Sequence, residues 1–291
     1  MFDRRLVGKT ISRIAAASAE QITQELLSDV PLQARVVGVT GAPGAGKSTL
    51  IGRLAAHRLR RAAALAILAI DPSSPLSNGS VLGDRIRMGS ISEDPRVFIR
   101  SLPSRSAQDG LTENTAEIIA ALDSFNFDEI LVETVGVGQS AYAVRTLVDV
   151  EILVLTPCTG DYVQAMKAGI METADIYVVN KADLPGADRV AADVLAVLQH
   201  RTNMPPVIQV RIDDAHGLMQ LSAAMDRCFA AQSTPGIRQD RRRALRRFMT
   251  QKLIERRLHA VLHGLPDRIW NDPLSDCYRR AMKEVISTLA R

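Results

Sequence analysis

The sequence predicts an α/β fold in which a mostly parallel central sheet is flanked by helices. Short runs of apolar and often β-branched residues alternate along the chain with segments of helical length. Strands that are apolar throughout are typical of parallel sheets buried on both faces, and parallel strands need crossovers that helices usually supply. With 291 residues, of which 46% are hydrophobic, the chain can bury a core of this kind.

The individual elements follow from these patterns in chain order. Helical spacing of apolar residues predicts an N-terminal helix from Lys9 to Leu27, which Asp29-Val30-Pro31 ends. After a linker at Gln232–Gly236 we expect an amphipathic helix from about Arg238 to Leu262 and a last helix from about Asp276 to Leu289. The strands between them are expected at Val36–Thr40, Leu65–Ile70, Val97–Ile99, Glu129–Val132, Glu151–Leu155, Ile176–Val179 and Val207–Val210.

These elements divide the chain into three expected parts. They are a short N-terminal helical segment (1–31), an α/β domain (32–232) and a C-terminal helical extension (233–291). The long helix of the extension carries an apolar stripe opposite its arginines, and such a stripe needs a partner surface.

The net charge of +4 is concentrated in that helix. Between Arg238 and Leu258 there are nine basic and two acidic residues, a local charge of +7 that leaves −3 for the rest of the chain. Because Phe248 alone is interleaved with these arginines, the aromatic platforms of single-strand binders are missing, and we do not expect nucleic-acid binding. The sequence has no apolar stretch of the roughly 18 residues that a spanning helix needs, so we expect a cytoplasmic protein without membrane association. It has no C-x-x-C pair, so we expect its thiols to be reduced.

A glycine-rich loop between the first strand and the helix expected from Ser48 to Arg60 matches G-x-x-x-x-G-K-[ST]. In this P-loop motif, backbone N–H groups point at the phosphates of a nucleotide and the helix N-terminus adds its positive dipole end. Lys47 would reach the β and γ phosphates, and the Ser48 hydroxyl would bind Mg²⁺. The residues expected to bind phosphate are Gly41, Ala42, Pro43, Gly44, Ala45, Gly46, Lys47, Ser48 and Thr49.

Acidic residues follow two other buried strands, where metal-orienting carboxylates of P-loop proteins lie. Asp71 ends the second strand, and Asp84 lies in the long polar stretch after it. Glu133 ends the strand after Asp128 and takes the place of the Walker-B acid. We expect Asp71, Asp84 and Glu133, with Ser48, around the metal. In the segment after Glu133, Gly136 would offer a backbone N–H to the γ phosphate, and Gln139 is a candidate for orienting the attacking water.

The base is predicted by Asn180-Lys181-Ala182-Asp183, an N-K-x-D sequence directly after an apolar strand. Guanine presents N1–H and N2–H donors to a carboxylate such as Asp183. Adenine has an acceptor at N1 and no 2-amino group, so it would leave the carboxylate unpaired. Lys181 would lay its stem over the base, and Asn180 would tie the loops together. The sequence therefore predicts a P-loop GTPase that binds GTP or GDP with Mg²⁺.

The chain resembles the ArgK/MeaB family, the GTPases associated with methylmalonyl-CoA mutase and related B12-dependent acyl-CoA mutases. The resemblance implies a homodimer held partly by the C-terminal helices. It also implies a G-protein chaperone that gates cobalamin loading and protects or reactivates the mutase, with a partner-responsive loop that includes Gly160, Asp161 and Lys167. The segments that carry the resemblance are Gly41–Thr49, Asp71–Ser74, Gly79–Asp84, Glu133–Ser140 and Gly169–Glu172 with Ala174-Asp175.

Four features depart from the family pattern. Ala141-Tyr142 stands where Glu usually follows Gly-Gln-Ser, and Arg211-Ile212 stands where a Ser-Ala pair usually closes over guanine. The usual Gly-Asp-Lys-Thr-Arg-Met reads Gly-Asp-Arg-Ile-Arg-Met over 83–88, and the N-terminal helical region is short.

The expected reaction is in-line attack of water on the γ phosphate, with slow intrinsic turnover that the partner stimulates. Two other P-loop functions remain as alternatives. A nickel or cobalt insertion GTPase would need Cys and His ligands near the switch segments, and Cys158 has neither as a neighbour in sequence. A small-molecule kinase would need an acceptor pocket and normally lacks N-K-x-D.

Overall fold

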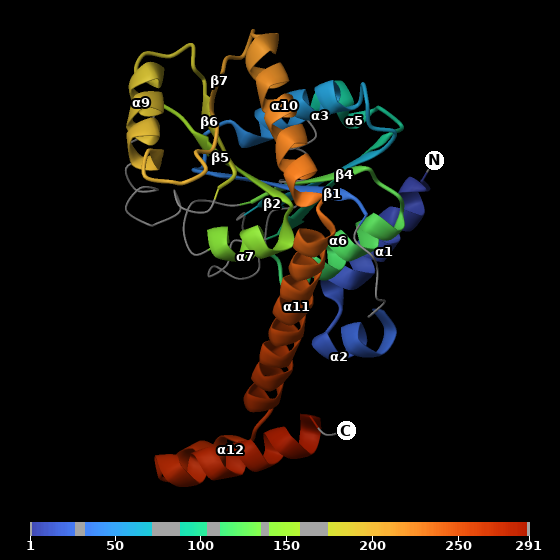
Figure 1. Cartoon of the computed structure of the whole chain (residues 1–291). Helices are drawn as coiled ribbons and strands as arrows, with labels where there is room; N and C mark the ends of the chain where they lie inside the picture. Colours follow the sequence, from blue (N-terminus) through green and yellow to red (C-terminus); the bar gives the residue numbers. More distant parts are fainter. Residues whose placement is uncertain are drawn as a thin grey trace. The chain divides into compact units, whose positions relative to one another are not determined.

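The computed structural model describes residues 2–26, 33–71, 88–103, 111–134, 140–157 and 174–289 of the chain (Figure 1). The chain divides into two compact units. The first consists of residues 1–15 and 30–241, and the second of residues 16–29 and 242–291. The first unit contains every strand that the structure describes.

Seven parallel strands form the sheet of the first unit, in the order β3-β2-β4-β1-β5-β6-β7. The α/β prediction with a parallel sheet is confirmed. The central strands β4 and β5 are buried at every position, as their apolar sequences predict. The strand bounds are β1 (Arg35–Gly41), β2 (Leu65–Asp71), β3 (Val97–Pro103), β4 (Glu129–Glu133), β5 (Val150–Leu155), β6 (Ile176–Asn180) and β7 (Val207–Val210).

Helices cover both faces of this sheet, and Figure 1 shows α3 and α10 on one side with α6 and α7 on the other. Successive side chains of β5 point to opposite faces of the sheet. Ile152 packs in the core with α3 and α10, whereas Leu153 packs in the core with α9. Gly38 of β1 lets α7 approach closely, because a Cβ there would lie 2.8 Å from a methyl group of Val144. The helices are α1 (Arg4–Ala16), α3 (Lys47–Arg58), α5 (Gly89–Ser92), α6 (Thr115–Ser124), α7 (Ser140–Leu147), α9 (Ala187–Leu198) and α10 (Ala215–Gln232).

The prediction of one N-terminal helix from Lys9 to Leu27 is wrong. The first helix, α1, ends at Ala16, and a second one, α2 (Ala19–Gln21), begins after Ser18 and continues as a π-helical turn, η1 (Ile22–Leu26). Ser18 starts the new helix through a capping box: its Oγ accepts from the Gln21 N–H at 3.2 Å, and Gln21 Oε1 accepts from the Ser18 N–H at 2.9 Å. The capping box at Ser18 therefore outweighs the apolar periodicity on either side.

The predicted linker at Gln232–Gly236 is also largely helical. Helix α10 extends to Gln232 and α11 (Pro235–His263) begins at a proline, which is tolerated in the first helical turn because it needs no N–H there. In the second unit, the end of α11 is followed by a 3₁₀ helix, η3 (Asp267–Asn271), and by α12 (Leu274–Leu289). Among the described residues of this small unit, the buried hydrophobic ones are Ala19, Ile22, Leu253, Ile269, Cys277, Ala281 and Val285.

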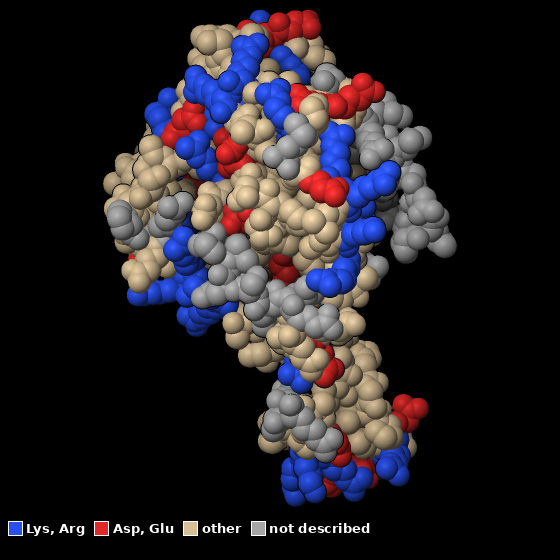
Figure 2. All heavy atoms as spheres, turned by 90° about the vertical axis from the view of Figure 1, so that its right-hand side faces the viewer, with Lys and Arg blue, Asp and Glu red and all other residues tan. Residues whose placement is uncertain are grey.

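Charged side chains of both signs are interspersed on the face of the molecule that Figure 2 draws. In the first unit, Arg96 pairs with Asp94 at 2.8 Å, and the Arg96 side chain is 45% exposed. Exposed pairs of this type contribute about 1 kcal/mol or less to stability. In the described part of the chain, the helices lack the combination of length and apolarity that crossing a membrane would need.

Candidate functional site: a phosphate loop beside a base-reading segment

The predicted site segments converge at the carboxyl edge of the sheet. Glu133, the last residue of β4, lies opposite Val39 of β1 and Ala69 of β2. The phosphate loop follows β1 directly, and the backbone of Asp71 lies two residues beyond Ala69 on β2. Ligands of parallel α/β sheets bind at this edge, so the topology places the loop, Glu133 and the Asp71 backbone around one site.

The phosphate loop has the backbone geometry that its glycines predict. Gly44 and Gly46 adopt φ values of 78° and 84°, a left-handed conformation that favours glycine. Helix α3 begins at Lys47, and its N-cap residue, Gly46, makes no side-chain cap. The N–H groups of the first helical turn therefore point toward the loop without a capping side chain, which is the arrangement that binds a phosphate.

The Lys47 ammonium lies beneath this loop. It is 8% exposed and its Nζ donates to the carbonyl oxygens of Gly41 at 2.8 Å and Ala42 at 3.0 Å. Burial lowers the pKa of Lys47, and the nearby charge of Glu133 partly opposes that effect. Burying an ammonium is unfavourable by itself, so negative phosphate groups would add to the charge compensation that Glu133 provides.

Ser48 and Glu133 meet beside Lys47. The Ser48 hydroxyl donates to Glu133 Oε1 at 2.8 Å, and both residues are buried. A hydroxyl and a carboxylate are hard oxygen donors of the kind that Mg²⁺ prefers, so these two residues fit that ion. The structure thus brings together two of the four residues predicted for the metal.

The other predicted residues of this site fall where the structure gives less detail. Of Asp71 the structure describes the backbone but not the side chain. Thr49 is exposed on α3. The predicted residues outside the described ranges are Asp84, Gly136, Gln139, Gly160, Asp161 and Lys167.

The base-reading segment contacts the phosphate loop directly. Asn180 Nδ2 donates to the Ala45 carbonyl at 2.8 Å, and Lys181 Nζ donates to the Gly44 carbonyl at 2.9 Å. Lys181 has a positive φ of 55°, which starts the turn that leaves the Asp183 side chain exposed. Asn180 thus links this segment to the phosphate loop, and the Asp183 side chain is exposed, whereas its predicted contact with guanine stays a prediction.

A buried polar chain beneath the loop was not predicted. The Thr134 hydroxyl donates to Thr40 Oγ1 at 3.2 Å, and the Thr40 hydroxyl donates to Glu151 Oε1 at 3.5 Å. All three are buried, and they link the residue before the phosphate loop to the residue after Glu133. The feature of the sequence that could have predicted this chain is Glu151, a carboxylate inside the otherwise apolar strand β5.

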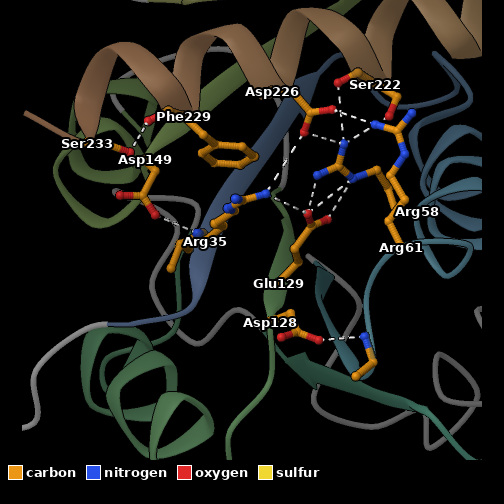
Figure 3. Close-up of polar contacts among 12 residues, drawn as sticks. Arg35, Arg58, Arg61, Asp128, Glu129, Asp149, Ser222, Asp226, Phe229 and Ser233 are labelled. Carbon is orange, nitrogen blue, oxygen red and sulfur yellow. Dashed lines mark hydrogen bonds and ion pairs between the residues drawn. The ribbon is translucent and has the colours of Figure 1, made fainter.

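A second polar cluster lies at the opposite, amino-terminal edge of the strands (Figure 3). Arg58 of α3 and Glu129 of β4 are each 3% exposed and form a two-pronged ion pair. Arg58 also donates to Asp226 of α10 at 2.7 Å, and Arg61 contacts the same carboxylate at 3.2 Å. A cavity of about 870 Å³ opens here, but these charges pair with each other, so the cluster fits a tie between α3, β4 and α10 better than a ligand site.

Comparison with known proteins places these features among GTPases. A family model described as methylmalonyl Co-A mutase-associated GTPase MeaB matches residues 5–266. A putative GTPase of Pyrococcus horikoshii is 46% identical over 187 residues, which span 64% of this chain and 59% of that protein. A probable GTPase of Mycobacterium tuberculosis is 38% identical over 263 residues, 88% of this chain and 76% of the relative. A mouse protein named methylmalonic aciduria type A homolog, mitochondrial, is 38% identical over 226 residues, 75% of this chain and 54% of that protein.

Two solved structures share the fold. The crystal structure of a LAO/AO transport system kinase covers the whole of both chains with a TM-score of 0.61 and 20% identity. The structure of HypB from Helicobacter pylori in complex with nickel has a TM-score of 0.52 and 19% identity, and covers 77% of this chain and 98% of HypB. At these identities the likeness concerns the fold alone.

Proposed function

The chain is a GTPase of the methylmalonyl-CoA mutase-associated MeaB family, and from this premise we propose that it acts as a chaperone of a B12-dependent acyl-CoA mutase. In this proposal the GTPase binds the mutase, gates its loading with cobalamin and protects or reactivates it. The observation that carries the catalytic part is the buried contact between Ser48 and Glu133 beside the phosphate loop. The family description and the name of the mouse relative support the choice of partner.

The chemistry proposed for this site is in-line attack of water on the γ phosphate of GTP. Lys47 and the backbone N–H groups that open α3 would bind the phosphate oxygens and stabilise the charge that develops on them. Mg²⁺, when bound, would neutralise charge on the β and γ phosphates, with Ser48 as a ligand and Glu133 and Asp71 around it. In this scheme Glu133 holds the Ser48 hydroxyl in place before the ion arrives.

Guanine selectivity would come from the exposed carboxylate of Asp183. Its two oxygens can accept from N1–H and N2–H of guanine, and the turn after Asn180 presents it beside the phosphate loop. Because Asn180 and Lys181 both donate to loop carbonyls, the base-reading segment and the phosphate loop would be held in one arrangement.

We further propose that the C-terminal helices form a homodimer. Helix α12 buries Cys277, Ala281 and Val285 on one side. Four large apolar residues at i, i+4 spacing are exposed on another, from Leu274 at 86% through Tyr278 and Met282 to Ile286 at 63%. Exposed apolar stripes of this length favour association, and a second copy offers the same stripe. Sedimentation of the whole chain as a monomer at micromolar concentration would contradict this part of the proposal.

The central experiment measures GTP turnover by the purified chain with and without a purified B12-dependent acyl-CoA mutase of the same organism. We expect slow turnover alone and acceleration with the mutase, together with a complex on size-exclusion chromatography. The Lys47→Ala variant serves as the control for contaminating activity, because loss of the phosphate-binding ammonium should abolish turnover in both conditions.

Two results would contradict the chaperone proposal. One is turnover that the mutase leaves unchanged together with the absence of any complex. The other is acceleration that persists when the mutase is replaced by an unrelated acyl-CoA enzyme.

A further inference from the structure

The loop after β7, residues 211–214, borders the base-reading segment. In the register of β6 and β7, Asn180 lies opposite Val210, the residue immediately before this loop. The Ala182 N–H donates to the Val210 carbonyl at 3.1 Å, so the middle of the N-K-x-D sequence is bonded to the end of β7. The 211–214 loop therefore begins next to the N-K-x-D segment.

One side chain of the phosphate-loop helix holds this loop at both of its ends. Arg53 of α3 donates from Nη1 to the Arg211 carbonyl at 2.7 Å and from Nη2 to the Asp214 carbonyl at 3.2 Å. The guanidinium is planar and rigid, so two bonds from one fork fix the separation and direction of the two carbonyls. Lysine, with a single ammonium on a flexible stem, could not hold both in the same way.

The C-terminal end of the loop is fixed by two further contacts. Asp214 caps α10 by accepting the His216 N–H at 2.7 Å, and this hydrogen bond lowers the pKa of the Asp214 carboxyl. Gly217 then packs so close to β7 that a Cβ would lie 2.5 Å from the Gln209 carbonyl. The loop therefore runs between a tightly packed helix start and the Arg53 fork.

Guanine leaves one group for this loop to read. When a carboxylate accepts from N1–H and N2–H, the O6 acceptor next to N1 still needs a donor, and a buried acceptor without one costs free energy. Ile212, which is 61% exposed, has no donor in its side chain, whereas the backbone of the loop carries N–H groups that can donate. The Asp214 N–H already donates to the Arg211 carbonyl at 3.4 Å inside the loop.

We propose that Arg53 is a positioning residue for guanine recognition: by holding the 211–214 loop through its carbonyls, it places a backbone N–H of that loop at O6 of the base. This inference rests on the guanine site proposed above. It predicts that Arg53 contributes to the binding of nucleotides that carry O6 and leaves the turnover of bound GTP unchanged. Helix α3 then serves both halves of the nucleotide, the phosphates at its first turn and the base through Arg53.

The test combines variants of the chain with changes in the base. Dissociation constants are measured by titration calorimetry for GDP, for IDP, which keeps O6 but lacks the 2-amino group, and for 6-thioguanosine diphosphate, whose sulfur is a weaker acceptor. Arg53→Ala should weaken the binding of GDP and IDP by roughly 5- to 30-fold. It should weaken the binding of 6-thioguanosine diphosphate by much less. Arg53→Lys should fall between wild type and Arg53→Ala, while kcat for GTP stays within about twofold of wild type in both.

Arg60→Ala is the matched control, because Arg60 is an exposed arginine just after the same helix and should leave all three affinities unchanged. Equal losses for the three nucleotides in Arg53→Ala would show a general structural role and overturn the proposal. Wild-type affinity for GDP in Arg53→Ala would overturn it as well. If Arg53→Ala does not fold, the same comparison is made with Arg53→Lys.

Failure of the underlying guanine site would look different. In that case the wild-type chain itself would bind ADP as tightly as GDP. Failure of the Arg53 inference alone would leave the wild-type preference for GDP over ADP intact, with Arg53→Ala showing either wild-type affinities or equal losses for the three nucleotides.

Discussion

The Ser48 hydroxyl donates a hydrogen bond of 2.8 Å to the Glu133 carboxylate, although 85 residues separate the two in sequence. Ser48 belongs to the first turn of α3 and Glu133 to the last position of β4. Neighbouring parallel strands bring the two together, since β1 leads into the phosphate loop and pairs with β4 over the whole length of β4. This contact is the centre of the proposed metal site.

Ser48→Ala should therefore remove most of the gain in GDP affinity that Mg²⁺ gives. Without the ion, we expect its affinity for GDP to remain close to that of wild type. In millimolar Mg²⁺, wild type should gain affinity and the variant should be weaker by roughly tenfold or more, because a hydroxyl bonded to a charged group is lost. Calorimetric titrations with and without Mg²⁺ measure the difference. Ser48→Thr keeps the hydroxyl and should behave like wild type, and an equal Mg²⁺ effect in Ser48→Ala would contradict the assignment.

Gly46→Ala should weaken nucleotide binding through both halves of the site. Gly46 has a φ of 84°, a conformation that costs an alanine about 1–2 kcal/mol, and its new Cβ would lie 2.6 Å from Asn180 Nδ2. We expect a loss of GDP affinity of at least about tenfold, because 1.4 kcal/mol corresponds to a factor of ten. At Gly89 a Cβ would meet nothing within 4 Å, so Gly89→Ala is the control and should bind GDP normally.

Asp183→Asn should change which base is bound. The amide can accept one hydrogen bond but offers donors where guanine also has donors, so GTP should bind at least about tenfold more weakly. Xanthosine triphosphate, which has an oxygen at position 2, should bind the variant better than it binds wild type. Competition titrations with the two nucleotides measure this exchange, and a variant with unchanged GTP affinity would refute the role given to Asp183.

Variants of the ion pair between Arg58 and Glu129 should change the free energy of unfolding rather than nucleotide binding. Arg58→Met leaves the buried Glu129 carboxylate without its main partner, so the free energy of unfolding should fall by about 3–5 kcal/mol. The double variant Arg58→Met/Glu129→Leu should recover much of that loss, because neither charge remains. Urea unfolding measures both. Arg61 is 75% exposed in its pair with Asp226, and Arg61→Ala should cost about 1 kcal/mol or less.

Tyr177 should make the first unit sensitive to alkaline pH. Burial raises the pKa of Tyr177 to about 12 from its usual value of 10.0, while Arg201 partly opposes the shift. The folded chain therefore holds this proton more tightly than the unfolded chain. Its contribution to stability is complete below pH 10 and declines as the pH rises toward about 12.

The expected slope for this group is a fall in the free energy of unfolding of up to about 1.4 kcal/mol per pH unit in that window. Tyr177→Phe removes the titrating group, so its free energy of unfolding should fall less steeply with pH than that of wild type. Urea unfolding at several pH values between 9 and 11 compares the two slopes. Parallel slopes would show that Tyr177 titrates normally in the folded chain.

Local patterns along the chain were enough to predict the strands and the site motifs. Apolar runs such as Ile176–Val179 form strands. When successive residues are all apolar, both faces of the strand need to be buried, and a parallel sheet covered by helices buries both. The N-terminal helix was predicted as one because periodicity extends across Ser18, whereas the capping box starts a second helix there. The linker was predicted from Gln232–Gly236 because proline and glycine usually interrupt helices, yet Pro235 occupies a helix start.

The sequence by itself determined which groups can bind a guanine nucleotide. The glycines of the phosphate loop, Lys47 and Ser48 are contiguous, and so are Asn180, Lys181 and Asp183, so each motif brings its own geometry with it. Partners distant in sequence were decided by the tertiary structure alone. Ser48 with Glu133, Arg58 with Glu129 and Arg53 with the 211–214 loop come together only when parallel strands align their ends and helices pack across them. Those contacts depend on strand order and helix packing, which no local pattern specifies.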